Sequence, residues 1–449
     1  MKIGRYLTRV TTTAPPTGLE FGDQRTQDRE LSAMARSLRG SEILRIAAEI
    51  RALGSAGRPI CNLTVGDFDP RQFPIPAALR ALVVRALEAG ETNYPPSDGI
   101  LALRQAVIEY IAREHGVSYP VESVVITSGG RPAIYAVFRC LVDPGDTVVS
   151  PVPNWNTDYY AGLVGARLAS VRTSPANAFQ PRVNDVAPHL GGATLLCLCS
   201  PGNPTGTVLP PDALRGILKA VLSENLRRSA TGRRPLFVLH DLMYGGLVFG
   251  GAPHAHPLAM VPEMAPWVVT VDGISKAFAA TGLRVGWAAG PPAAIARIRD
   301  FVGHVGAWAP RPEQVATATF LRDAPAITAF HAVMERELTA RQDALFDGIV
   351  ALKEAGAPVD AVRPQGGMYL ALRLDLAGRA VGGIRVSDNE GIRRLLLERA
   401  GLAVVPFQAF GDPEESGWFR LSVGAVSVQE IQQGLKRLEV LLEGVAKRE

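Results

Sequence analysis

Short apolar runs alternate with helix-like segments through the middle of the chain. β-branched or otherwise apolar residues fill six of these runs, at residues 124–127, 147–150, 194–199, 236–240, 267–272 and 285–290. Strands that alternate with helices form a largely parallel sheet with helices on both faces. A DPGD sequence at 143–146 predicts a tight turn between one helix and the next strand. The pattern therefore predicts an α/β fold.

The two ends of the chain carry helical periodicity. Near the start, apolar residues recur at helical spacing over 42–53, and Gly54 is expected to end that helix. Past residue 330 we expect a long helix over 334–356, a strand over 369–376 and a closing helix that opens with a capping box of Ser427 and Glu430. Such a set indicates a smaller α+β unit beside the large sheet.

Composition and charge exclude several classes of protein. Hydrophobic residues make up 47% of the 449 residues and charged residues 20%, which excludes disorder over most of the length. The net charge of +4 is too small to indicate a nucleic-acid-binding surface. We interpret the basic segment LRRSATGRRP, at 226–235, as a solvated loop.

Cysteine usage and the lack of a hydrophobic leader bear on location. The four cysteines form no CxxC pair, which suits a reducing compartment. Cys197 and Cys199 alternate within an apolar run, so we expect core residues and not metal ligands. The sequence has neither a secretory signal nor a stretch of about 18 apolar residues. We expect a soluble, cytoplasmic protein that binds neither a membrane nor nucleic acid.

A Gly-rich turn follows the first predicted strand, and ligands of α/β proteins bind at such strand ends. In ITSGGRPAIYAVF, at 126–138, the N–H groups of Gly129, Gly130 and Arg131 would open a helix with Pro132 in its first turn. Free N–H groups at a helix start attract anions. A plain tight turn would also explain the glycines.

Two polar segments end further strands. SPGNPTG, at 200–206, holds the Asn203 amide between prolines, although a structural Asx turn would also explain the asparagine. LFVLHDLMY places Asp241 at a strand end and Tyr244 three residues later. A carboxylate there is costly unless it meets a cation or donor, and the simpler alternative is a capping aspartate beside a packing tyrosine.

Two basic groups lie near apolar strands. In VDGISKAFAATGLRVGW, Ser275 and Lys276 follow a strand and Arg284 lies eight positions beyond the lysine. An amine held in an apolar pocket loses its proton and attacks carbonyls, whereas an isolated lysine is usually on the surface. WFRLSVGA buries Arg420 in a strand, so either a structural carboxylate or a ligand carboxylate must face it.

Taken together, residues 40–445 resemble the class I/II aminotransferases, the fold-type I enzymes that use pyridoxal 5′-phosphate. SPGNPTG, the Asp-x-x-Tyr step, and SK with arginine at plus eight occur in the family's order. The resemblance implies a large domain with a mainly parallel sheet between helices and a smaller α+β domain. GSEILRIAAEIR and NLTVGDFDP are most similar to the aspartate-aminotransferase branch.

The resemblance assigns catalytic roles to Lys276, Asp241 and Tyr244. Lys276 would form the internal aldimine and then move a proton between the substrate Cα and the cofactor. Asp241 would pair with the pyridine nitrogen. Asn203 and Tyr244 would hydrogen-bond the phenolic oxygen of the ring.

Other residues would hold the cofactor's phosphate and ring. Gly130, Arg131, Ser275 and Arg284 would hold the phosphate. Trp155 would stack on the ring, although a core tryptophan is the competing interpretation.

The substrate and the partner subunit follow from the same resemblance. Arg420 would bind the substrate α-carboxylate, and Gly66 would line the pocket with Trp155 and Asn203. Tyr94 matches a tyrosine that, in relatives, reaches the phosphate of the neighbouring subunit, so a homodimer is implied.

The resemblance also implies a domain organisation. We expect an N-terminal arm at 1–35, flexible or wrapped around a partner. A discontinuous small domain would comprise 36–75 and 330–449, around a large cofactor-binding domain at 76–329.

Several positions depart from the family pattern. Gly273 replaces a phosphate-binding Ser or Thr of several relatives, which would lighten the phosphate site, and Phe407 replaces a common Gly and would reshape the pocket entrance. His240 could tune Asp241 or be a packed core histidine. His254 and His256 lack ligand partners at metal-binding spacing, so no metal is expected.

The leading functional hypothesis is transfer of an amino group from an L-amino acid to a 2-oxo acid by a ping-pong route, with aspartate or glutamate and 2-oxoglutarate as the best pair. A dicarboxylate needs a second cation, for which Arg104 and Arg311 are candidates. The motifs leave open β- or γ-elimination or replacement, as in carbon–sulfur lyases and aminocyclopropane-carboxylate synthases. A non-catalytic regulator that binds the cofactor is the third hypothesis.

Overall fold

The computed structural model describes residues 28–38, 40, 42–55 and 57–445. The chain divides into two compact units, Met1–Gly40 and Ser41–Glu449. In the first unit, Ser32 Oγ accepts a hydrogen bond from the Ala35 N–H and caps helix α2 (Ala33–Ser37). The predicted arm falls largely outside the described residues, so it stays a prediction.

The second unit contains a seven-stranded sheet in the order β2-β8-β7-β6-β5-β3-β4. Strand β8 runs antiparallel to both of its neighbours, and the other pairings are parallel. The strands are β2 (Val124–Thr127), β3 (Thr147–Val152), β4 (Arg167–Arg172), β5 (Leu195–Cys199), β6 (Phe237–Asp241), β7 (Val268–Gly273) and β8 (Gly286–Ala289). The predicted α/β fold with a mainly parallel sheet is confirmed.

One strand of this sheet, β4, was not among the predicted strands. It lies at the edge of the sheet, pairs only with β3, and buries only Val171 of its six residues. An edge strand needs little apolar sequence, because one side of it faces no neighbour. The six predicted strands are all present, with ends within two residues of the expected positions.

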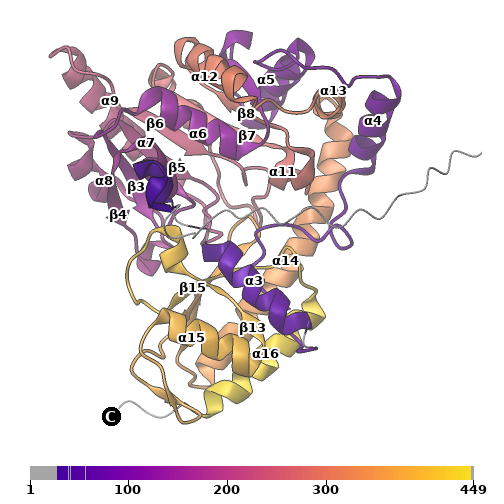
Figure 1. Ribbon diagram of the computed structural model, residues 1–449, viewed down its shortest axis with the longest axis vertical. Coiled ribbons are helices and arrows are strands. Elements are labelled where there is room, and N and C mark those ends of the chain that lie inside the picture. Colours follow the sequence, from indigo (N-terminus) through magenta and orange to yellow (C-terminus); the bar gives the residue numbers. More distant parts are fainter. Residues whose placement is uncertain (1–27, 39, 41, 56, 446–449) are drawn as a thin grey trace, which may run out of the picture. The chain divides into compact units, whose positions relative to one another are not determined.

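Helices cover both faces of the sheet (Figure 1). One face packs on α6 (Gly130–Leu141), α7 (Thr157–Val164) and α12 (Pro292–Val305). The other packs on α4 (Ala77–Glu88), α5 (Leu101–His115), α8 (Val183–Leu190), α9 (Pro211–Ser229), α10 (Pro257–Met260) and α13 (Arg311–Phe320). Val238 and Leu239 of β6 belong to opposite cores, because successive strand residues point to opposite faces.

A smaller domain is built on a four-stranded antiparallel sheet in the order β14-β15-β10-β9. Its strands are β9 (Val359–Val362), β10 (Tyr369–Leu374), β14 (Val405–Pro406) and β15 (Trp418–Ser422). Helices α14 (Ala324–Glu354), α15 (Asn389–Leu395) and α16 (Val428–Glu443) pack around it, with a π-helix at Leu396–Ala400. Short pairs join β1 (Cys61–Asn62) to β13 (Leu402–Ala403) and β11 (Ala380–Val381) to β12 (Ile384–Arg385).

The helix ends differ in part from the predictions. The capping box of Ser427 and Glu430 is present and opens α16. Helix α14 begins ten residues earlier than predicted, because Asp323 Oδ1 accepts the Ala326 N–H and caps a start that the periodicity did not mark. Gly54 does not end α3 (Glu42–Ser55), which continues to the next residue. The predicted domain limits at 36–75, 76–329 and 330–449 stay a prediction.

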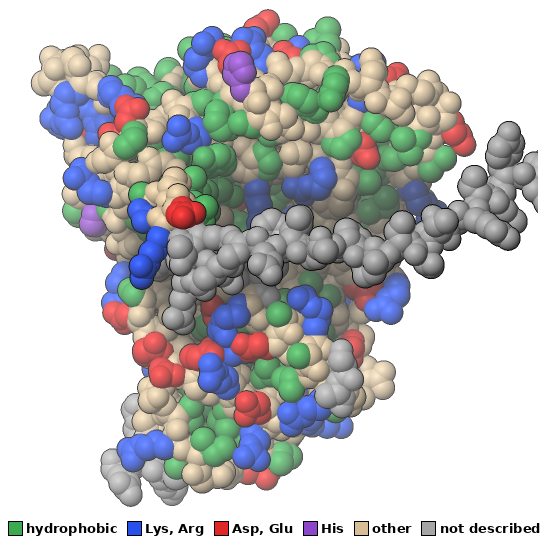
Figure 2. Space-filling view, in the orientation of Figure 1, with side chains coloured by type: hydrophobic (Ala, Val, Ile, Leu, Met, Phe, Trp, Pro, Cys, Tyr) green, Lys and Arg blue, Asp and Glu red, His purple; other side chains and the backbone are tan. Residues whose placement is uncertain are grey.

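The basic segment 226–235 is not a free loop. Its first four residues form the last turn of α9, and Arg228 is buried with its Nε bonded to Glu224. Arg227 also pairs with Glu224 and Arg234 with Asp143, so three of its four cations have carboxylate partners. Positive and negative side chains are intermingled over the visible part of the smaller domain (Figure 2). No helix among the described residues is both long and apolar enough to span a membrane.

Helix α16 offers a matched test of the smaller domain's core. Leu438 is 0% exposed and Val440 is 68% exposed on the same helix. We expect Leu438→Ala to lower the free energy of unfolding by about 2–5 kcal/mol through lost burial and a cavity. Val440→Ala should change it by about 0.5 kcal/mol or less. Chemical denaturation followed by circular dichroism measures both, and equal effects would contradict the assigned core.

Candidate active site

A cavity of about 530 Å³ lies where the carboxyl ends of the central parallel strands meet the smaller domain. It is the place where ligands of open α/β sheets bind. The cavity is lined by nearly all of the predicted site residues: Gly66, Gly130, Arg131, Trp155, Asn203, Asp241, Tyr244, Ser275, Lys276, Arg284 and Arg420. Segments more than 350 residues apart in sequence thus contribute to one site.

Lys276 lies in the short helix α11 (Ile274–Ala277), directly after β7. Its Nζ donates a hydrogen bond to the Gly66 carbonyl oxygen at 2.7 Å. Burial lowers the pKa of Lys276 to about 8, and the neighbouring Asp67 opposes that change. The amine is therefore far more often neutral at physiological pH than an exposed lysine, as a nucleophile requires.

Asp241 ends strand β6 and faces the cavity. Its Oδ1 accepts the Met243 N–H at 2.9 Å, and burial raises the pKa of its carboxyl to about 6. No lysine or arginine of the described residues forms an ion pair with it. His240, the preceding residue, is fully buried, and burial lowers its pKa to about 3, so its ring is neutral. Asp241 therefore has no cationic partner among the described residues, and a ligand could supply one.

Arg420 lies in the middle of β15 and is 1% exposed. Its Nη2 donates to the Thr64 carbonyl at 2.7 Å, its Nη1 to Asn203 Oδ1 at 3.3 Å, and its Nε has no partner. The guanidinium lies over the rings of Tyr369 and Phe410, at 4.6 and 4.9 Å. Within the described part of the chain no carboxylate pairs with it, which favours a ligand carboxylate over a structural one.

The start of α6 presents free donors to the cavity. Gly130 and Arg131 form its first turn, where no side chain caps the N–H groups. Gly129 differs from the prediction, because its N–H donates to the Thr127 carbonyl at 2.8 Å and is not available to an anion. The turn thus uses one of the three expected donors to close itself.

Arg284 reaches the same region from beyond β7. Its Nη2 donates to the Ser128 carbonyl and its Nη1 to the Thr281 carbonyl, both at 2.8 Å. A Cβ at Gly129, which has φ +93°, would lie 2.4 Å from Nη2 of Arg284. Glycine at this position lets the Arg284 guanidinium approach the start of α6. The positive charge of the guanidinium there adds to the free N–H groups of the helix and strengthens an anion site.

Trp155 lines the cavity near a further cation. The guanidinium of Arg131 lies 4.9 Å from the centre of its ring. Arg131 is exposed and forms no ion pair with a carboxylate of the described residues. A cation held over an aromatic face but without an anion is ready to bind one.

Several lining residues were missed by sequence reasoning. The hydroxyl of Tyr369 lies 2.8 Å from that of Tyr244, and Asp67 lies next to Gly66. The remainder are Ile43, Ile134, Met243, Thr281 and Gly282. Only Tyr369 carried a usable signal, a polar ring at the start of a strand that pairs with the strand of Arg420.

Some predicted residues lie elsewhere. Tyr94 does not line the cavity; it is 83% exposed and packs edge-on against Trp308. Arg104 pairs with Asp98 and Arg311 with Glu91, so neither proposed second cation reaches the cavity.

The two departures from the family pattern also have a structural explanation. Phe407 is 0% exposed in the core with Trp418 and does not line the pocket entrance. A Cβ at Gly273 would lie 2.7 Å from the Val285 carbonyl oxygen, so the antiparallel β8 leaves no room there for a phosphate-binding side chain.

These residues fit pyridoxal 5′-phosphate. The unpaired Asp241 carboxylate matches a ring nitrogen that carries a proton, and the Lys276 amine matches an aldehyde. Arg284 and the free N–H groups of α6 match a phosphate. Among the described residues no group of histidine, cysteine or acidic side chains could hold a metal ion.

Comparisons with known proteins identify the family and agree with this cofactor. The family described as aminotransferase class I and II matches residues 58–438. A probable aspartate/prephenate aminotransferase of Thermus aquaticus is 32% identical over 92% of this chain and all of its own. The aspartate aminotransferase of Streptomyces avermitilis is 30% identical over 92% of this chain and 97% of its own.

A solved structure gives the same result. The aspartate aminotransferase of Thermus thermophilus with maleate superposes with a TM-score of 0.80 at 29% identity, over 92% of this chain and 99% of its own. The chain belongs to the class I and II aminotransferases and is a pyridoxal 5′-phosphate-dependent transaminase.

Proposed function

We propose that the protein exchanges an amino group between aspartate and glutamate: aspartate donates it to 2-oxoglutarate, which gives oxaloacetate and glutamate. The observation that carries the proposal is the buried Arg420 guanidinium, which faces a cavity shared with Lys276 and Asp241 and has no carboxylate partner in the described chain. The names of the aspartate aminotransferase relatives support an acidic substrate. Elimination or replacement chemistry is not favoured by these relatives.

Lys276 is the residue that binds the cofactor and moves the proton. When bound, pyridoxal 5′-phosphate supplies an aldehyde that links to amines and a ring that accepts electrons released at the substrate Cα. Because burial lowers the pKa of Lys276 to about 8, its Nζ loses a proton far more readily than that of an exposed lysine, so this atom can take a proton from Cα and return it elsewhere on the same face. Asp241 keeps the ring nitrogen protonated, since its buried carboxylate is stabilised by that charge.

The remaining polar groups orient the ligands. Asn203 and Tyr244 would hold the oxygen of the cofactor ring, and Trp155 would lie against the ring. Arg284, Ser275 and the N–H groups of Gly130 and Arg131 hold the phosphate. Gly66 borders the substrate beside Arg420, whose fork fixes the α-carboxylate and with it the direction of the Cα–H bond.

We assign the guanidinium of Arg131 to the second carboxylate of an acidic substrate. The backbone of Arg131 serves the phosphate, but its side chain is exposed over Trp155 and has no anion among the described residues. Arg104 and Arg311 are already paired outside the cavity. Among the described residues that line the cavity, Arg131 is therefore the cation that remains for the distal carboxylate.

A homodimer with Tyr94 contributed to the partner's site is part of the proposal. The 83% exposure of Tyr94 and its position against Trp308 support it, because a large aromatic side chain on a surface favours an interface. A cytoplasmic location stays a prediction.

The half-reaction tests the proposed function. The cofactor-loaded protein mixed with L-aspartate alone should convert its absorbance to that of the pyridoxamine form and release one equivalent of oxaloacetate. Stopped-flow absorbance with product analysis measures both. Release of pyruvate or 2-oxobutyrate without this conversion would instead support elimination and overturn the transaminase assignment.

The pKa of Lys276 predicts how the cofactor-free protein takes up pyridoxal 5′-phosphate. A pKa of about 8 leaves only about a tenth of the amine neutral at pH 7, so the uptake rate should rise with pH through about 8 and level off above 9. Asp67→Asn should move this midpoint to lower pH, because Asp67 raises the pKa of Lys276. A rate that keeps rising to pH 10 would contradict a buried lysine.

Arg131→Met tests the distal carboxylate. Loss of a charged hydrogen bond worth about 1.5–3 kcal/mol should raise KM for aspartate and 2-oxoglutarate by about 10- to 100-fold. KM for alanine and pyruvate should change by less than about threefold, since neither has a second carboxylate. Arg311→Met is the matched control and should change none of these values. Equal losses for acidic and small substrates would show that the guanidinium does not read the side chain.

A further inference from the structure

Helix α3 forms one wall of the active-site cavity without contributing a reacting group. Of its residues, Ile43 lines the cavity, and Ile46 and Ile50 are buried in a core with Phe407 and Trp418. Lys276, Asp241 and Arg420 all lie on other elements. Helix α3 can therefore change the fit of a substrate without changing the groups that move protons.

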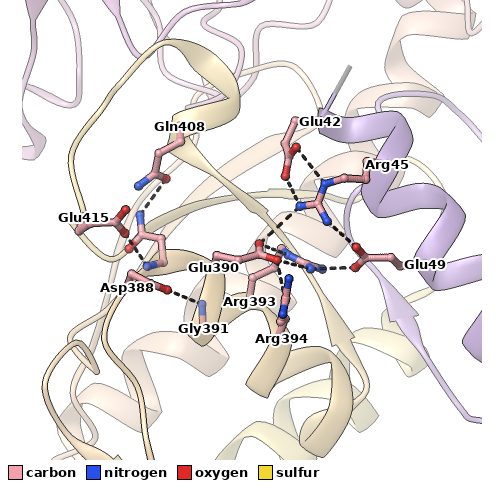
Figure 3. Close-up of polar contacts among 11 residues, drawn as sticks. Glu42, Arg45, Glu49, Asp388, Glu390, Gly391, Arg393, Arg394, Gln408 and Glu415 are labelled. Atoms are coloured by element: carbon pink, nitrogen blue, oxygen red, sulfur yellow. Dashed lines mark hydrogen bonds and ion pairs between the residues drawn. The ribbon is translucent and has the colours of Figure 1, made fainter. Parts of the chain in front are cut away.

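The neighbouring face of α3, which carries Glu42, Arg45 and Glu49, is joined to α15 by a network of charges (Figure 3). Arg393 of α15 donates from Nη2 to Glu49 of α3 at 2.8 Å and from Nε to Glu390 of its own helix at 2.7 Å. Arg45 of α3 lies 3.6 Å from Glu390 and pairs with Glu49 at 2.5 Å. The charges are Glu42, Glu49 and Glu390 against Arg45, Arg393 and Arg394, so the network is neutral.

Arg393 differs from the other cations of this network in its burial. Its side chain is 1% exposed, whereas those of Arg45 and Arg394 are 43% and 61% exposed. Exposed ion pairs contribute little, but removal of one partner from a buried pair is strongly destabilising. The carboxylates of Glu49 and Glu390 are 35% and 36% exposed, so the link between the two helices is half-buried, and Arg393 is its most buried member.

Helix α15 is the fixed end of this link. The Asp388 carboxylate accepts the Gly391 N–H at 2.7 Å, and Glu415 accepts the Asn389 N–H at 2.6 Å. The Asn389 amide also donates to Gln408 at 2.9 Å. These bonds anchor the start of α15, as Figure 3 shows, whereas α3 is the first helix of its unit and no earlier element of that unit holds it.

We propose that Arg393 is a positioning residue that holds α3, and with it Ile43, against the substrate in the cavity. This inference rests on the proposed function only for its kinetic readout. Arg393 touches neither the substrate nor the cofactor, so its loss should weaken substrate binding and leave the chemical step intact.

Arg393→Met tests the proposal, with Arg394→Met as the matched control on the same helix. We expect Arg393→Met to raise KM for aspartate by about tenfold, an effect of the size found when two sites are coupled through packed secondary-structure elements. The value of kcat should stay within about threefold of the wild-type value. The cofactor absorbance of this variant should be unchanged. Arg393→Lys should restore part of the loss, because an ammonium still reaches one carboxylate. Arg394→Met should match the wild type, since its exposed pair contributes little.

A double mutant separates the proposed route from general damage. Ile43→Ala should raise KM in the same way, and combining it with Arg393→Met should add little, because both act at one wall. A double mutant whose increase in KM equals the product of the two single-mutant increases would overturn the proposal. An unchanged KM in a folded Arg393→Met protein would also overturn it. Should Arg393→Met fail to fold, Glu49→Gln removes the link to α3 alone and should give the same rise in KM.

Hydrogen exchange decides the proposal independently of catalysis. Amides of α3 should exchange about tenfold faster in the Arg393→Met or Glu49→Gln protein than in the wild type, and not in Arg394→Met. Exchange that is the same in all of them would refute a positioning role. If the wild type fails to transaminate any amino acid, the proposed function fails, and the exchange of α3 still decides the role of Arg393.

Discussion

Two opposite charges, each buried without an oppositely charged partner among the described residues, define the active site of this enzyme. Asp241 presents a carboxylate without a cation, and Arg420 presents a guanidinium without a carboxylate, within the described part of the chain. Either group alone would cost several kcal/mol to bury. A ligand that carries a protonated ring nitrogen at one end and an amino-acid carboxylate at the other would stabilise both, so the proposed cofactor and substrate sites depend on the same two charges.

The fold brings these two charges to one cavity, although they come from different sheets. The parallel strands β5, β6 and β7 end side by side, which places Asn203, Asp241 and Lys276 on one edge of the sheet. Arg420 comes from the antiparallel β15 of the smaller domain, so the cavity depends on how that domain packs. The long helix α14 runs from the core of the large sheet to the core of the smaller one and joins the two.

Local sequence patterns predict most of the strands and helices. They also predict the polar residues that follow the strands, because each of these residues is adjacent in sequence to the strand that it follows. Contacts between distant segments were not predictable in the same way. Tyr369, Asp67 and Ile43 line the cavity only through tertiary packing, and the ion pair that occupies Arg311 involves Glu91, 220 residues away in the sequence. The closing bond of Gly129 depends on backbone geometry that residue types alone do not fix.

The most direct test is to locate the cofactor's covalent link. Reduction of the loaded protein with borohydride, followed by proteolysis and mass spectrometry, should find a single pyridoxyl group on Lys276. The Lys276→Ala protein should carry none. A pyridoxyl group on another lysine, or its absence from Lys276 in a protein that still transaminates, would contradict the account.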